Sequence, residues 1–372
     1  MNSFQVGNPV TGTNLLGRKK EVEQIISLLK LGQSVVLMAP RRFGKTSLVL
    51  EILSRLKKDK AFTAYIDVFS SPSINILSTK ITEAVLKNHK LDKLFLKTRN
   101  NTINMIKNLK LKAVIEDFEF ILGFPENKQK NWELLEESID FIEGFSKKHH
   151  HKMICAFDEF GDIKKLDGEN IVKLFRSIIQ RHSNSAYIFS GSYESIMNEI
   201  FINKSAPFYR LARIINLGFI DIEIFKTHYV KTLKKYNIVY NNKFICEILR
   251  FTRGHPYNSQ LALQEIILYK MIHNKQAEVN DIKQSMLLAE KNYLEKSWEV
   301  LTKSKENTKT LLAIITKKKS IYSTLKNMKV NVARSLNNLQ GSGIIVKKDG
   351  EYILTDPLLE YWIHVNILHQ YY

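Results

Sequence analysis

The stretch "VVLMAPRRFGKTSLVLEIL", residues 35–53, decides how the first part of the chain folds. An apolar run ending at Met38 predicts a buried strand, and the run that begins at Thr46 has the periodicity of a helix. The residues between them fit the phosphate-binding pattern G-x-x-x-x-G-K-[ST], except that Ala39 stands where the first Gly is usual. Ala is the smallest side chain after Gly, and a turn residue with negative φ accepts it. We therefore predict that this loop still holds a nucleotide.

The nucleotide expected in this loop is ATP with Mg²⁺. Backbone N–H groups of such a loop wrap the phosphates, and the positive end of the following helix assists them. Lys45 is expected to reach the β and γ phosphates, the Thr46 hydroxyl to bind Mg²⁺, and Gly44 to let the backbone approach closely. The residues predicted to contact the nucleotide are Ala39, Pro40, Arg41, Arg42, Phe43, Gly44, Lys45, Thr46 and Ser47.

A second motif, "MICAFDEF", is a short apolar strand that ends in Asp158 and Glu159. In a parallel sheet the carboxyl end of such a strand faces the bound phosphates. We expect Asp158 to hold Mg²⁺ through water, and Glu159 to orient and polarise the attacking water. Acidic pairs often follow apolar runs by chance, but the position of this pair downstream of "GKTS" makes the interpretation specific.

Two further segments offer candidates for the γ-phosphate. "AYIFSGS" contains Ser190 and Ser192, either of which could sense the phosphate, with Ser192 closer to the loop. The alternative is a small residue that merely ends a strand. "APFYRLARIINLG" offers Arg210 first and Arg213 second to stabilise the charge that builds on the γ-phosphate. The alternative there is a surface salt bridge.

The order of predicted elements divides the chain into three parts. Strands alternate with helices over residues 1–220, which predicts an α/β domain with a parallel sheet covered on both faces. Residues 221–299 predict a small helical domain without strands. In residues 300–372, three helices precede two alternating strands joined at Asp349-Gly350, the pattern of a winged helix-turn-helix with a hairpin wing. The helical insert at residues 74–151 carries no chemistry that the sequence reveals.

Positive charge is concentrated in the predicted winged helix. The chain of 372 residues has a net charge of +19. Residues 303–348 hold eleven basic residues and the single acid Glu306, a net of +10. Such an excess suits a polyanion such as double-stranded DNA. The eleven are Lys303, Lys305, Lys309, Lys317, Lys318, Lys319, Lys326, Lys329, Arg334, Lys347 and Lys348.

The segment "VNVARSLNNLQGSG" would be the recognition helix, with Arg334, Ser335 and Asn338 able to face a groove. Lys347 and Lys348 would lie at the wing turn, where phosphate contact is usual. The competing interpretation is a winged helix that packs only against the helical domain or a protein partner.

Composition excludes several classes of protein. The two cysteines, Cys155 and Cys246, cannot form a disulfide framework and lack metal-ligand spacing. The segment "MNSFQVGNPVTGT" has no basic stretch followed by an apolar core, so no secretory signal is expected. No run approaches the length of a membrane span. We expect a cytoplasmic protein with no membrane partner.

Six segments occur in an order that resembles a known family: "LLGRKKEVEQI", "APRRFGKTSL", "FDEF", "FSGSYESIM", "PFYRLARIINL" and "RGHPYNSQL". Over roughly residues 4–270 the chain resembles the archaeal-type ATPase family, in the STAND (signal-transducing) branch of AAA-related P-loop NTPases. The resemblance implies an ASCE/AAA-like ATPase core, a helical lid and a C-terminal winged helix.

The resemblance also assigns residues near the base. It implies that Gly17, Arg18 and Glu21 lie near the adenine. The lid motif maps to Gly254, His255 and Pro256, with Pro256 packing near the base, although Pro also suits any first helical turn.

Together these features predict a slowly hydrolysing ATP switch that couples its ATP or ADP state to DNA binding. The alternative is a signalling or scaffold ATPase whose winged helix binds a protein partner. Self-association stays open, since the hydrolytic Arg could come from a neighbouring subunit.

Overall fold

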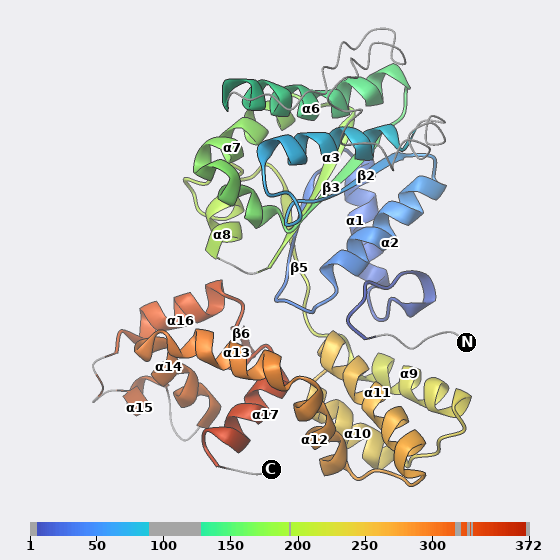
Figure 1. Ribbon diagram of the computed structural model, residues 1–372, viewed down its shortest axis with the longest axis vertical. Coiled ribbons are helices and arrows are strands. Elements are labelled where there is room, and N and C mark those ends of the chain that lie inside the picture. Colours follow the sequence, from blue (N-terminus) through green and yellow to red (C-terminus); the bar gives the residue numbers. More distant parts are fainter. Residues whose placement is uncertain are drawn as a thin grey trace.

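The computed structural model describes residues 6–88, 128–192, 195–316, 321–325, 328 and 330–369. A five-stranded sheet lies at the centre of the first part of the chain, in the order β2-β3-β4-β1-β5, and every neighbouring pair is parallel (Figure 1). The predicted α/β fold with a parallel sheet is therefore confirmed. The strands are β1 (Val35–Met38), β2 (Phe62–Asp67), β3 (Met153–Asp158), β4 (Ser185–Gly191) and β5 (Arg213–Asn216).

Helices cover both faces of this sheet because strand side chains alternate between the faces. In β1, Val35 and Leu37 pack into a cluster with the first two helices, whereas Val36 and Met38 pack on the opposite face. All four side chains are buried. The first face carries α1 (Lys19–Lys30) and α2 (Lys45–Lys58), and the second carries α3 (Ile74–Leu86), α6 (Lys128–Lys148), α7 (Lys164–Ile179) and α8 (Ser195–Phe201).

The insert predicted at residues 74–151 contributes α3 and α6, which pack on each other. Residues 89–127 lie outside the described part of the chain. After them the chain resumes with α6 at Lys128.

Five helices follow the sheet, and we call them the helical region: α9 (Ile222–Lys235), α10 (Asn242–Thr252), α11 (Pro256–His273), α12 (Val279–Ala289) and α13 (Lys291–Thr302). Polar side chains begin the first three by accepting hydrogen bonds from backbone N–H groups. Asp221 caps α9, Asn241 caps α10, and His255 caps α11 with Pro256 at its first position.

In its described residues, the last part of the chain, here called the C-terminal unit, contains three helices, a hairpin and a final helix. The hairpin strands pair antiparallel, and both turn residues, Asp349 and Gly350, have positive φ. This confirms the predicted hairpin, because a tight turn of that type needs positive φ at both central residues. The elements are α14 (Lys305–Thr316), α15 (Ile321–Leu325), α16 (Val332–Gly341), β6 (Ile345–Lys348), β7 (Glu351–Leu354) and α17 (Pro357–Asn366).

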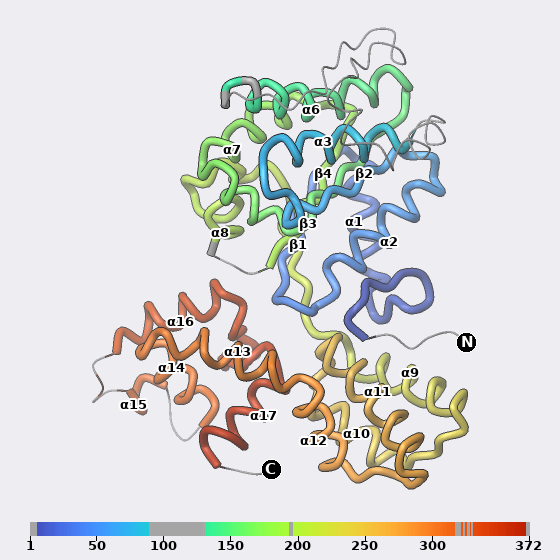
Figure 2. Tube along the Cα trace, in the orientation of Figure 1, coloured from blue at the N-terminus to red at the C-terminus, as the bar shows by residue number. Residues whose placement is uncertain are grey.

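The helical region and the C-terminal unit share one hydrophobic cluster, which includes Ile248 and Leu249 of α10 and Ile363 of α17. An ion pair of 2.5 Å between Arg253 and Glu360 joins the same two parts. Figure 2 shows them side by side below the sheet. No helix in the described ranges is long and apolar enough to cross a membrane.

Candidate nucleotide-binding site

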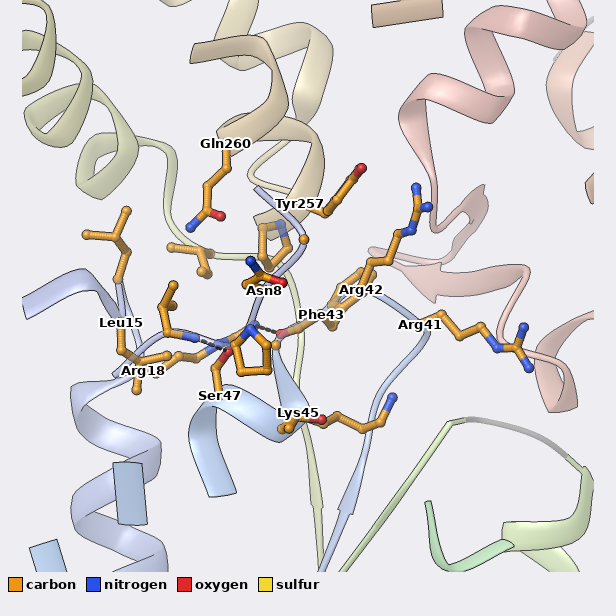
Figure 3. A pocket seen from close by; sticks show the side chains of 18 of the residues that line it. Asn8, Leu15, Arg18, Arg41, Arg42, Phe43, Lys45, Ser47, Tyr257 and Gln260 are labelled. Atoms are coloured by element: carbon orange, nitrogen blue, oxygen red, sulfur yellow. Dashed lines mark hydrogen bonds between the residues drawn. The ribbon is translucent and has the colours of Figure 1, made fainter. Parts of the chain in front are cut away.

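A cavity of about 720 Å³ opens at the carboxyl end of β1, where nucleotides bind in open parallel sheets. Three parts of the chain line it: the loop between β1 and α2, an N-terminal segment over residues 7–16, and the start of α11 (Figure 3). From the sheet side, Glu159 and Asp162 also reach it. The geometry matches the site predicted from the sequence, with the helical region as one wall.

The loop has the backbone of an anion-binding nest. Arg42 and Gly44 have φ of 66° and 83°, whereas Phe43 between them is not left-handed. Alternation of this kind turns successive N–H groups toward one point. Ala39 is fully buried and its φ is not positive, as predicted for a position that does not require Gly.

The structure gives a second reason for Gly44, beside the close approach to the nucleotide that the sequence predicts. Its φ of 83° is left-handed. Such a backbone costs a non-glycine residue roughly 1 kcal/mol or more.

Lys45 lies at the centre of the site, and its side chain is only 5% exposed. Its Nζ donates to the carbonyl oxygens of Ala39 and Pro40 at 3.2 and 3.3 Å, and to Ser192 Oγ at 3.3 Å. Glu159 Oε1 lies 4.0 Å away. The structure thus brings Ser192 to the loop lysine, as the sequence predicts.

Asp158 gathers polar side chains from three elements. Its Oδ2 accepts from Thr46 Oγ1 at 2.7 Å and from the Tyr65 hydroxyl at 2.8 Å, and its Oδ1 accepts from the Ser190 hydroxyl. The two serines of β4 therefore have different partners, Ser190 the acid and Ser192 the lysine. A hydroxyl beside a carboxylate is the oxygen set that Mg²⁺ takes from protein, with phosphate and water completing its shell.

Sequence reasoning missed Tyr65, which lies on β2 next to β3. Burial and the charge of Asp158 raise the pKa of Tyr65 far above its ordinary value, so the phenol stays protonated and donates. The only sequence signal was a polar aromatic near the end of an apolar strand.

Glu159 directly follows the strand and lies at the cavity with 41% of its side chain exposed. Its φ of 48° is left-handed. Non-glycine residues persist in this conformation where surrounding contacts impose it, and such residues cluster at functional sites.

Arg18 is almost completely buried and lines the cavity. It donates to the carbonyl oxygen of Gly218 at 2.6 Å and pairs with Glu21 at 3.0 Å. Burial lowers the pKa of Arg18, and the hydrogen bond and charge of Glu21 act against that effect. The side chain ties α1 to the segment that leaves the sheet.

Gly17 and Gly254 both lie against Ile220. A Cβ on Gly17 would fall 2.3 Å from Ile220 Cγ2, and one on Gly254 would fall 2.0 Å from the Ile220 carbonyl oxygen. Ile220 N also donates to the Gly254 carbonyl. Both glycines are therefore required by close packing at the start of the helical region. Pro256, two residues on, lines the cavity as predicted.

The N-terminal segment is held on α2 by contacts that the sequence did not suggest. Ser47 Oγ accepts from Val10 N at 3.0 Å, and Glu51 accepts from Gly12 N at 2.7 Å. That backbone hydrogen bond lowers the pKa of Glu51. The Ser47 hydroxyl thus holds this segment over the cavity.

The arginines predicted at the site lie in different places. The Arg42 guanidinium pairs with Glu290 of the helical region at 2.6 Å. Arg210 and Arg213 are exposed and absent from the cavity lining. Arg41 and Arg42 both line the cavity.

Comparisons with known proteins agree with this geometry. The model of a family described as an ATPase domain predominantly from Archaea matches residues 15–260, more than half of the chain. A search of curated proteins found no match.

Two solved structures share the fold at low sequence identity. The Walker-type ATPase paby2304 of Pyrococcus abyssi has a TM-score of 0.71 at 16% identity, over 96% of this chain and 98% of that one. The ORC2 protein of Aeropyrum pernix, described as ADPNP–ADP complexes, has a TM-score of 0.56 at 12% identity, over 95% and 93% of the two chains. The family model matches the loop, the sheet and the start of α11. The chain therefore belongs to the family of P-loop ATPase domains found predominantly in Archaea.

Proposed function

We propose that this protein binds ATP with Mg²⁺ and hydrolyses it slowly, as a molecular switch of the STAND kind. One observation carries the proposal: Lys45, Thr46, Asp158 and Glu159 meet at the carboxyl ends of β1 and β3. Thr46 and Asp158 are 2.7 Å apart, and Lys45 and Glu159 are 4.0 Å apart. The complexes with ADPNP and ADP described for the Aeropyrum pernix ORC2 protein support a nucleotide in this fold.

Each residue has a distinct part in the proposed reaction. Lys45 holds the β and γ phosphates as a point charge, in place of the neutral oxygens that it now contacts. Thr46 and Asp158 would hold Mg²⁺, which neutralises charge on the phosphates when it is bound. Glu159 orients and polarises the attacking water, and Ser192 keeps the lysine aimed at the γ-phosphate. Arg18 and Pro256 enclose the base.

Slow turnover is proposed because neither predicted finger arginine lies at the cavity. Arg210 is exposed, and its guanidinium lies over the ring of Tyr209 at 5.3 Å. An Arg near the γ-phosphate accelerates hydrolysis by several orders of magnitude, about 10³ to 10⁵. We propose that Arg210 acts only when a neighbouring subunit presents it, if this protein self-associates.

We propose three domains: the ATPase core at residues 1–220, a lid at 221–299 and a winged helix at 300–372. In this proposal Arg334, Lys347 and Lys348 contact double-stranded DNA. All six described basic residues of the charged segment are exposed, namely Lys303, Lys305, Lys309, Arg334, Lys347 and Lys348. The other five, Lys317, Lys318, Lys319, Lys326 and Lys329, lie outside the described residues.

One observation favours the alternative function, in which the winged helix contacts protein. Lys347 and Lys348 line a cavity of about 460 Å³ together with Pro40 and Phe43 of the phosphate-binding loop. In addition, α16 packs on α8 of the sheet domain. A winged helix docked in this way could report the nucleotide state to a protein partner.

ATP turnover with and without duplex DNA separates the two functions. A DNA-coupled switch should change its rate when duplex is added at low salt, and Lys347→Ala/Lys348→Ala should remove the change. The rate should stay constant if the winged helix serves a protein partner. Wild-type protein with no turnover and no nucleotide binding would refute the ATPase proposal itself.

A further inference from the structure

Arg42 belongs to the phosphate-binding loop, but its guanidinium lies between two tyrosine rings of the helical region. It is 4.2 Å from the ring centre of Tyr257 on α11 and 3.8 Å from that of Tyr293 on α13. Figure 3 shows Arg42 and Tyr257 on the same side of the loop. A planar guanidinium stacks on aromatic faces in a way that an ammonium does not.

Glu290 completes this arrangement, which we call the Arg42 cage: Tyr257, Glu290 and Tyr293. Glu290 Oε2 lies 2.6 Å from Arg42 Nη1, and Tyr257 donates its hydroxyl proton to the other carboxylate oxygen. The Glu290 side chain is 10% exposed. Burial lowers the pKa of Arg42, but the hydrogen bond and charge of Glu290, together with Tyr257 and Tyr293, raise it by more. Removal of one partner from such a shielded pair costs more than from a surface pair, because the other charge is left poorly solvated.

The cage acts on a residue whose backbone is strained. Arg42 has a left-handed φ of 66°, a conformation that glycine adopts freely and arginine does not. Such a conformation persists only where surrounding contacts impose it. The same conformation forms the nest, because the left-handed residues 42 and 44 turn the loop N–H groups toward one point.

We propose that Arg42 is a positioning residue: the cage holds its backbone left-handed and so keeps the loop aimed at the phosphates. This inference rests on the proposed ATP binding. Loop geometry serves the bound ground state and the transition state alike, so its loss should raise KM and leave kcat nearly unchanged.

The cage also connects the loop to the C-terminal unit. Asp356, the residue that caps α17, accepts from Asn258 Nδ2 at 2.8 Å and from the Tyr293 hydroxyl at 3.4 Å. Movement of the helical region away from the loop would release Arg42. Because such coupling is reciprocal, nucleotide in the loop should in turn favour the packed arrangement of the helical region.

The decisive test compares Arg42→Ala with Arg42→Gly in binding of fluorescently labelled ADP. Arg42→Ala loses the cage but keeps the strain, so we expect its Kd to rise about tenfold. Arg42→Gly loses the cage and the strain together, so its Kd should stay within about threefold of wild type. If Arg42→Gly is as weak as Arg42→Ala, the side chain acts in some other way and the proposal is wrong.

Glu290→Gln and Glu360→Gln form a matched pair of further variants. Each removes one charge from a half-buried ion pair between the helical region and another part, but only Glu290 contacts the loop. Glu290→Gln should raise KM about fivefold with kcat unchanged, whereas Glu360→Gln should change neither value by more than about twofold. Equal effects of the two variants would contradict the proposal.

Hydrogen exchange separates this inference from the proposed function. In nucleotide-free protein, the backbone amides of Ala39 and of residues 41–45 should exchange faster in Glu290→Gln than in wild type. Their exchange should be unchanged in Glu360→Gln. If this exchange pattern is found but wild-type protein binds no ADP, the proposed function is refuted and the proposed role of the cage stands. Unchanged exchange in Glu290→Gln would refute the cage whether or not ADP binds.

Discussion

The Thr46 hydroxyl donates to Asp158 at 2.7 Å across 112 residues of sequence. The carboxylate that receives it also accepts from Tyr65 and Ser190, so three hydroxyl groups fix its orientation. Partners of this kind orient metal ligands and tune their affinity. The proposed Mg²⁺ site can therefore be tested by changing Tyr65, which does not have to bind the metal itself.

Tyr65→Phe should raise the Mg²⁺ concentration needed for half-maximal turnover by about tenfold, because the carboxylate loses a donor that holds its orientation. A Mg²⁺ titration of ATPase rate at saturating ATP measures this. Tyr229→Phe is the control, since it removes a buried hydroxyl that donates to the Ser259 carbonyl within the helical region. Equal Mg²⁺ dependence in wild type and Tyr65→Phe would show that Tyr65 only stabilises the fold.

Lys45→Ala should abolish nucleotide binding, because it removes the point charge held at the β and γ phosphates. Glu159→Gln should keep binding and lose turnover, because the amide cannot polarise the attacking water. Labelled-ADP binding and phosphate release measure the two effects. Glu199→Gln, which changes an exposed glutamate of α8, serves as the control for Glu159→Gln. If Glu159→Gln hydrolyses ATP at the wild-type rate, another residue acts as the base.

Ala39→Gly should be nearly neutral for binding. Ala39 is buried without a positive φ, so the loop gains nothing from glycine there. Nucleotide Kd should change by less than tenfold, which corresponds to about 1.4 kcal/mol. A larger change, with the variant still folded by circular dichroism, would mean that the first loop position limits nucleotide affinity.

Much of the fold and part of the site follow from local sequence pattern. The strand before the loop and the helix after it show as an apolar run and a helical period, and "DE" marks the end of β3. Lys45, Asp158 and Ser192 meet because parallel strands bring their carboxyl ends to one edge. Local sequence signals are enough to predict these contacts, because the parallel topology brings the strand ends together.

Other parts of the site depend on contacts that leave no local signal. Arg42 and Glu290 are 248 residues apart, and nothing in either segment indicates the partner. Ser47, predicted to contact the nucleotide, lines the cavity, and its hydroxyl also holds the N-terminal segment. Tyr65 resembled an ordinary strand aromatic. In each case packing between separate elements determines which residues meet. The hydrophobic periodicity of one element cannot predict such a contact.

His255 should make the protein less stable as the pH falls below neutrality. Burial lowers the pKa of His255 to about 4, so the folded state keeps it neutral while the unfolded state protonates near pH 6.5. The unfolded state therefore binds more protons between these values, and the free energy of unfolding should fall as the pH drops through that window. The full effect is about 3 kcal/mol.

His255→Gln tests this, because its amide oxygen can still accept from Asn258 N at the start of α11. Chemical denaturation from pH 7 to 4.5 should show a smaller loss of stability in the variant than in wild type. Some pH dependence should remain, since burial also lowers the pKa of His182 and His228. Parallel curves for wild type and variant would mean that His255 does not titrate differently on unfolding.

Binding of the C-terminal unit to DNA should be driven mainly by phosphate contacts and fall steeply with salt, because each neutralised phosphate releases condensed counterion. Lys347→Ala/Lys348→Ala should lower affinity about equally for all duplexes and reduce the salt slope by up to about two units. Arg334, exposed near the start of α16, should behave differently if it reads a base edge. Arg334→Ala should then cost roughly 1 to 3 kcal/mol on a preferred duplex and relax the preference there.

Fluorescence anisotropy of labelled duplexes across a salt series measures all of these effects. Lys234→Ala/Lys235→Ala is the matched control, because it removes two adjacent exposed lysines from α9, outside the C-terminal unit. If both double variants weaken binding equally, the interaction depends on net charge and not on the wing. No binding of wild type to any duplex at about 50 mM salt, where phosphate contacts are strong, would leave the protein-partner function. In that case the cavity that Lys347 and Lys348 share with the phosphate-binding loop would be the place to look for nucleotide-dependent docking.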